Sequence, residues 1–232
     1  MGGVGGEVGH GGCIPKVRNT WYQVVMDDLS FTTFLKISLM ATTQGKFGLL
    51  QRMHNGTGGY DFYKRMKLAA REVARGETPA SSILSQLQSI KRDSERNHNV
   101  QMANHFVDWW IAQIGAVAEA ERPTGRYKTP EMNFGVRLTP ELAYNCGAVS
   151  YVTYLWATNL PKLTRQAAGA GLFMLRSELA KDKFRKVKFQ ILDLRQKRLY
   201  EEDCITNQSS SILQADIAQI NAMWKDIIPK AA

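Results

Sequence analysis

Apolar residues in the first half of the chain recur at intervals of three and four positions, the spacing that gathers side chains on one face of an α-helix. The first such stripe consists of Phe31, Phe34, Leu35 and Leu39. Ser30 stands just before this stripe and is placed to cap the start of a helix. Residues 60–75 contain no glycine or proline, and Gly76 follows them, which predicts a helix that ends there. An earlier segment, residues 20–25, has the composition of a short strand.

Two more apolar stripes precede residue 115. The first contains Ile83, Leu84, Leu87 and Ile90, and the second contains Met102, Phe106, Trp109, Trp110 and Ile114. Pro79 suits the start of the first helix, and the polar residues 92–99 form either a bend or a continuation of the second. Two adjacent tryptophans cannot both point inward, so the Trp109–Trp110 pair is expected to pack against the second half or a subunit. Residues 17–120 are therefore expected to be mainly helical and to form a layer.

The pattern changes in the second half, after a segment, 121–130, that its prolines and glycine predict to be a loop. Alternating residues predict strands over 134–138 and 187–191, and residues 149–156 are apolar on both faces, as in a central strand. Helices are expected from Thr164 to Leu179 and after the serines at 209–211.

Residues 131–232 thus follow the order strand, strand, helix, strand, helix. The expected fold class is α+β, with an N-terminal helical layer followed by a small mixed sheet flanked by helices. A chain of 232 residues fits one compact domain. Residues 1–16 are rich in glycine, which predicts a flexible tail.

Composition narrows the environment in which the protein is expected to work. No run of 18 apolar residues exists, and the N-terminus lacks the basic start and apolar core of a signal peptide, so no membrane association is expected. The three cysteines are an odd number and are widely spaced, which argues against a disulfide framework or a zinc knuckle and favours a reducing cytoplasm.

Charge points to polyanionic partners. Thirty lysines and arginines against 21 acidic residues give a net charge of +9, which favours nucleic acid or an acidic protein as a partner. The basic residues concentrate between positions 181 and 198. They are Lys181, Lys183, Arg185, Lys186, Lys188, Arg195, Lys197 and Arg198. On a strand, Lys186 and Lys188 would point away from the apolar face and form a basic outer sheet face for nucleic acid; the alternative is a solvated face that discourages edge pairing.

A weaker candidate for phosphate binding lies between residues 54 and 67. Gly56, Gly58 and Gly59 could bring backbone N–H groups close to an anion, and Lys64 and Arg65 follow in the next helix. The segment lacks the complete G-x-x-x-x-G-K-[ST] pattern, and an ordinary surface turn is the alternative.

Catalytic groups are scarce, and no catalytic residue, metal ligand or cofactor is assigned. His98 and His105 lie about 10 Å apart along a helix axis, too far to share an ion. The order strand, Pro140-Glu141, turn, strand, helix resembles the core of the PD-(D/E)xK nucleases over about 50 residues. That resemblance implies an acid before one strand and acid-x-Lys on the next, binding Mg²⁺. Glu141 matches the first acid, but residues 151–156 contain neither an acid nor a lysine, so the implied site is degenerate.

Three functions therefore remain. The first is a non-enzymatic binding protein, associated with nucleic acid through a basic sheet face and part of a larger assembly. The second is a structural or interaction subunit that contacts an acidic protein or a second copy of itself. The third is the degenerate PD-(D/E)xK-like nuclease.

Overall fold

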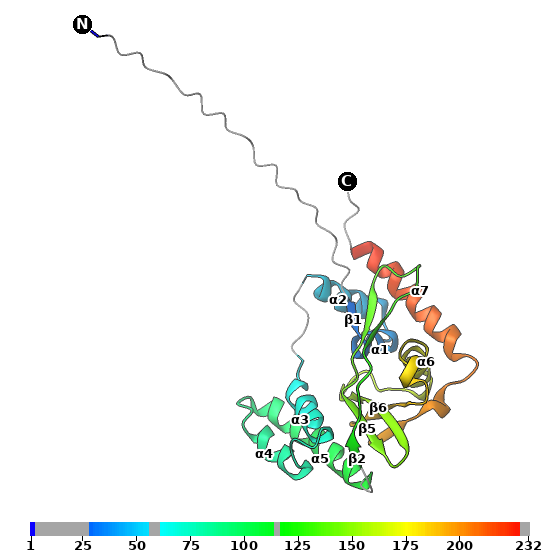
Figure 1. Ribbon diagram of the computed structural model, residues 1–232. Coiled ribbons are helices and arrows are strands. Elements are labelled where there is room, and N and C mark those ends of the chain that lie inside the picture. The colour runs from blue at the N-terminus through cyan, green and yellow to red at the C-terminus, as the bar shows by residue number, and fades with distance from the viewer. Residues whose placement is uncertain (3–27, 56–60, 114–116, 228–232) are drawn as a thin grey trace.

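The computed structural model describes residues 1–2, 28–55, 61–113 and 117–227 (Figure 1). Most of the predicted glycine-rich tail, the strand expected over 20–25, and Gly56, Gly58 and Gly59 lie outside these residues. The α-helices are α1 (Phe31–Leu39), α2 (Thr43–His54), α3 (Lys64–Ala74), α4 (Ile83–Gln88), α5 (Asp93–Ala112), α6 (Arg165–Leu179) and α7 (Ser209–Ile227). The strands are β1 (Asp28–Ser30), β2 (Val117–Glu119), β3 (Gly125–Tyr127), β4 (Gly135–Leu138), β5 (Leu142–Cys146), β6 (Val149–Trp156), β7 (Lys188–Asp193) and β8 (Arg198–Tyr200).

A five-stranded sheet with the order β2-β5-β6-β7-β8 forms the centre of the fold. β5 and β6 make an antiparallel hairpin in which Leu142 pairs with Thr153. Gly147 in the hairpin turn has a φ of +59°, a conformation that favours glycine. β6 and β7 are parallel, so the chain needs a crossover, which α6 provides. The strands expected over 149–156 and 187–191 are confirmed within one or two residues.

A smaller sheet with the order β1-β4-β3 lies beside the first. β4 pairs with β1 in parallel and with β3 in antiparallel fashion. The prediction of a loop over 121–130 was wrong for residues 125–127, which form β3. Pro123 and Pro130 keep out of the ladder but leave room for a three-residue strand between them. Thr139-Pro140-Glu141 separates β4 from β5, so the chain passes there from one sheet to the other.

Helices cover both faces of the five-stranded sheet (Figure 1). Along β6, Tyr154 and Trp156 pack in the core shared with α1, α6 and α7, whereas Leu155 packs in the core shared with α3, α4 and α5. The expected α+β class is confirmed. The N-terminal helices do not all lie in one layer, because α1 contacts α6 and α2 contacts α7 on the face opposite α3–α5.

Local signals fix several helix ends as expected. Ser30 and Thr164 cap α1 and α6, and each side-chain oxygen accepts a hydrogen bond of 3.2 Å from the N–H three residues later. The polar stretch before Met102 continues the helix, since α5 begins at Asp93. Trp110 is buried and Trp109 half-buried, and both rings contact Tyr144 of β5, so the pair packs against the second half of the chain.

Candidate nucleic-acid interface

The basic sheet face expected from residues 181–198 is not formed. β7 begins at Lys188, and its other five residues, 189–193, are all buried because helices cover both faces of the sheet. A six-residue strand spans about 20 Å. The predicted cations therefore separate into two groups at opposite ends of β7, five before Phe189 and three after Asp193.

The first group, which we call the β7 amino-end cluster, is exposed. It consists of Lys181, Lys183, Arg185, Lys186 and Lys188. Lys181 pairs with Glu178 at 3.1 Å, and Lys183 pairs with Glu121 at 2.5 Å. Both pairs are solvent-exposed, so each contributes little to stability, but each offsets part of the positive charge.

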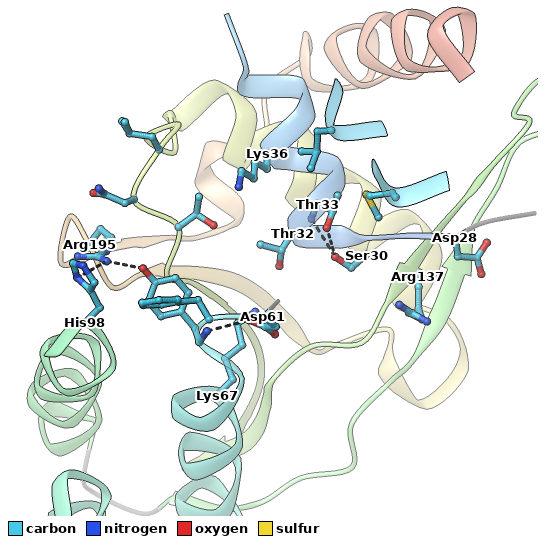
Figure 2. Close-up of a pocket in the computed structure, with 17 residues that line it drawn as sticks. Asp28, Ser30, Thr32, Thr33, Lys36, Asp61, Lys67, His98, Arg137 and Arg195 are labelled. Atoms are coloured by element: carbon cyan, nitrogen blue, oxygen red, sulfur yellow. Dashed lines mark hydrogen bonds between the residues drawn. The ribbon is translucent and has the colours of Figure 1, made fainter. Parts of the chain in front are cut away.

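In the second group, Arg195 differs from its neighbours. Lys197 and Arg198 are exposed, whereas Arg195 is half-buried and points toward the helical layer. Its Nη2 donates to Tyr63 Oη at 2.6 Å, and its Nε donates to the carbonyl oxygen of Ala157 at 3.3 Å. Asp193, fully buried, holds the turn by accepting a 2.8 Å hydrogen bond from Arg195 N. Arg195 therefore ties α3 to the sheet and faces the largest cavity (Figure 2).

This central cavity has a volume of about 700 Å³. Its walls come from α1, α2, the start of α3, α5, β4 and the segments after β6 and β7. Four cations line it: Lys36, Lys67, Arg137 and Arg195. The segments after two parallel strands meet here, and the carboxyl ends of parallel strands are where open sheets usually bind ligands.

Two smaller hollows continue from the central cavity. The second hollow, of about 260 Å³, shares Asp61 and Lys67 with the cavity, and the third, of about 270 Å³, shares Arg71 and Glu141 with the second. We call the three together the basic groove. Its cations are Lys36, Lys64, Lys67, Arg71, Arg75, Arg122, Arg137 and Arg195, and its acids are Asp28, Asp61, Glu119, Glu121 and Glu141.

Cations crowd most closely where the second and third hollows meet. Burial lowers the pKa of Arg122, and the neighbouring positive charges of Arg71 and Arg75 lower it further. Burial raises the pKa of Tyr154, which lines the second hollow, well above its ordinary value, and the negative charge of Glu141 adds to the effect. Like charges are thus held together in this part of the groove.

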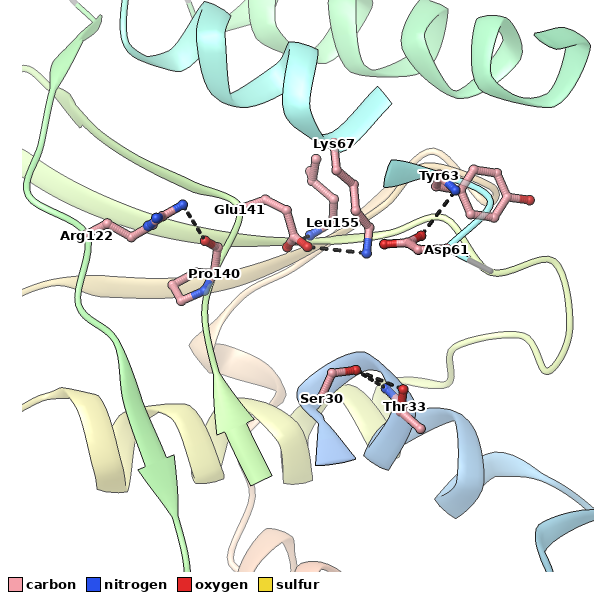
Figure 3. Close-up of polar contacts among 9 residues, drawn as sticks. All are labelled: Ser30, Thr33, Asp61, Tyr63, Lys67, Arg122, Pro140, Glu141 and Leu155. Atoms are coloured by element: carbon pink, nitrogen blue, oxygen red, sulfur yellow. Dashed lines mark hydrogen bonds and ion pairs between the residues drawn. The ribbon is translucent and has the colours of Figure 1, made fainter. Parts of the chain in front are cut away.

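Glu141, the acid on which the nuclease resemblance depends, is engaged on both oxygens (Figure 3). Oε2 accepts a 3.0 Å hydrogen bond from Leu155 N, and Oε1 lies 3.3 Å from Lys67 Nζ. The neighbouring strand β6 presents no acid or lysine. The buried carboxylate therefore links β5, β6 and α3, and any catalytic role would have to compete with these contacts.

The weaker phosphate candidate is divided by the structure. Lys64 lines the second hollow, whereas Arg65 points to Ser89 at 3.4 Å and is not among the groove residues. Sequence reasoning missed six groove cations, which are Lys36, Lys67, Arg71, Arg75, Arg122 and Arg137. A signal for three of them was present, because Lys64, Lys67, Arg71 and Arg75 follow helical spacing. They lie opposite the buried stripe of α3.

The two histidines have separate roles in packing. Arg195 Nη2 lies 3.3 Å from His98 Nδ1, while the ring of His105 contacts the carbonyl oxygen of Leu194. Among residues 28–55, 61–113 and 117–227, no cluster of three or more His, Cys, Asp or Glu side chains is arranged to hold a metal ion. Within those same ranges, no helix is both long and apolar enough to span a bilayer. Neither the known protein-family models nor the curated proteins gave a match to this sequence.

Proposed function

We propose that this chain is a non-enzymatic nucleic-acid-binding protein, working within a larger assembly in the reducing cytoplasm, and that it binds the nucleic acid along the basic groove. The supporting observation is the continuity of three hollows whose linings carry eight basic and five acidic side chains. Phosphates neutralised by such cations release counterions, which provides most of the affinity of nonspecific nucleic-acid binding.

The groove is a better candidate than the β7 amino-end cluster. Two of the five cluster cations are already paired with carboxylates on the open surface. Charges that line a recess act through low-dielectric walls, which focus the field and weaken screening by salt. The cations of the groove also come from several elements, so they offer phosphate contacts in more than one direction.

Fluorescence anisotropy of labelled single- and double-stranded DNA and RNA, at two salt concentrations, tests the proposal. We expect binding that weakens steeply with salt. The double reversal Lys36→Glu and Arg137→Glu should reduce affinity at least about tenfold and flatten the salt dependence by about one unit of slope per lost phosphate contact. Lys225→Glu, an exposed change on α7, is the matched control and should have a small effect.

The same assay separates the competing surfaces. Reversal of Lys186 and Lys188 to Glu tests the β7 amino-end cluster; if it abolishes binding while the groove variant binds normally, the groove assignment is wrong. If no strand binds at low salt, nucleic acid is excluded and an acidic protein becomes the leading partner. Labelled strands incubated with Mg²⁺ or Mn²⁺ should remain intact, because β6 lacks the acid and lysine of the nuclease pattern.

A further inference from the structure

The central cavity has two chemically different sides. Phe62, Tyr63 and His98 form an aromatic wall, in which the Phe62 ring centroid lies 5.3 Å from that of Tyr63 and 5.7 Å from that of His98. Across the hollow, the first turns of α1 present Thr32 and Lys36 (Figure 2). A planar ring is complementary to the first side, and an anion is complementary to the second.

The aromatic wall is held in place before any ligand arrives. Asn99 of α5 is fully buried, and its Nδ2 donates a 2.8 Å hydrogen bond to the carbonyl oxygen of Phe62. The guanidinium of Arg195 lies 5.7 Å from the Tyr63 ring centroid and bonds its hydroxyl. These contacts fix the backbone of Phe62 and the ring of Tyr63, so little ordering would be needed on binding. The Phe62 ring is only half-buried, which leaves a face for stacking.

We infer that the central cavity binds one nucleotide unit, with the base stacked on Phe62 and the phosphate beside Lys36. The volume of about 700 Å³ is within the usual range of small-ligand sites. Leu160 lies at the cavity and is 69% exposed, an apolar side chain that can cover the base from the solvent side. A base can enter such a site only when it is not paired and stacked in a duplex, so the site selects a single strand.

This inference rests on the proposed function, because the rest of the strand would lie along the groove, but it has a separate chemical basis. The same nucleotide chemistry could come from a strand or from a free mononucleotide. Calorimetric titration with adenosine 5′-monophosphate and with ribose 5-phosphate isolates the contribution of the base. We expect the nucleotide to bind at least about tenfold more tightly than the sugar phosphate, the lower part of the range for one stacked base.

Three variants locate the site. Phe62→Ala should remove the preference for the nucleotide, whereas Phe62→Trp should keep it. Lys36→Gln should weaken both ligands by a similar factor, because both carry the phosphate. If Phe62→Ala fails to fold, Leu160→Glu replaces an exposed side chain with a carboxylate at the cavity and should weaken nucleotide binding about tenfold.

The outcomes distinguish the two proposals. If a labelled strand binds the groove but Phe62→Ala leaves its affinity unchanged, and the nucleotide binds no better than the sugar phosphate, the inference about the cavity is overturned and the proposed function stands. If the nucleotide binds in a Phe62-dependent way while no strand binds, the site stands for a free nucleotide and the proposed function fails. Tighter binding of duplex than of single strand would also overturn the inference.

Discussion

Replacement of Glu141 by alanine should be among the most destabilising single changes at the groove. The Glu141 side chain is only 6% exposed, and it satisfies Leu155 N at 3.0 Å and Lys67 Nζ at 3.3 Å. Leaving the buried Leu155 N–H without a partner costs about 1–3 kcal/mol. Removing the partner of a buried cation costs about 3–5 kcal/mol, but Lys67 keeps 14% exposure and can reach water. We therefore expect a total loss of about 3 kcal/mol in the free energy of unfolding.

Glu141→Gln separates the hydrogen bond from the charge. The amide oxygen of glutamine can still accept from Leu155 N, so only the attraction to Lys67 is lost, and the expected cost is about 1 kcal/mol. Urea unfolding curves of wild type, Glu141→Ala, Glu141→Gln and Lys67→Met, together with the double variant, measure both terms and their coupling. An alanine variant within about 0.5 kcal/mol of wild type would refute the structural role of Glu141.

The glutamine variant also connects stability with binding. Loss of one carboxylate leaves Lys67 unpaired beside the second hollow, so Glu141→Gln should bind a nucleic-acid strand several-fold more tightly although it is less stable. Weaker binding with unchanged folding would contradict this reasoning and would assign Glu141 a direct role with the ligand.

Two further predictions concern the core. Gly169→Ala should lose more than about 2 kcal/mol by thermal unfolding, because its Cβ would lie 2.2 Å from the carbonyl oxygen of Cys204; Gly48→Ala, where the nearest atom is a side-chain nitrogen at 3.7 Å, is the control and should be neutral or slightly stabilising. Burial raises the pKa of Tyr144 to about 12, although hydrogen bonds with Gln190 and Thr153 oppose the shift. The folded state therefore favours the neutral phenol, so this contribution is complete below about pH 10 and is lost as the pH rises toward 12. Unfolding measured across that window should fall less steeply for Tyr144→Phe, and equal slopes would contradict the assignment.

Periodicity and capping predicted the helices better than the small strands. α1 and α6 combine an apolar stripe with a serine or threonine cap, so sequence spacing and chemistry agree. β1 and β3 contain three residues each, and nothing in such a short segment marks it as a strand before its partner β4 is known.

The environment of β7 shows why the predicted interface was wrong. Lys186, Lys188 and Gln190 alternate with apolar residues, which in an isolated pattern indicates one wet face. In the fold, Gln190 is buried, and its Nε2 donates to Tyr144 Oη at 2.7 Å and to Thr153 Oγ1 at 2.8 Å. A polar residue can occupy a covered face when neighbouring strands supply its hydrogen bonds, and those neighbours cannot be identified from spacing alone.

The groove could be only partly predicted for a related reason. The basic stripe of α3 was readable, but a charged helix face is ordinarily a solvated surface. It becomes a candidate site because Lys36, Arg122 and Arg137 come from three other elements and meet it across hollows. Burial and the charges of Arg71 and Arg75 disfavour the charged form of Arg122, so the folded protein holds these cations together against their repulsion. An anion bound between them would relieve that repulsion, and the complex with a nucleic-acid strand should therefore unfold at a higher temperature than the free protein.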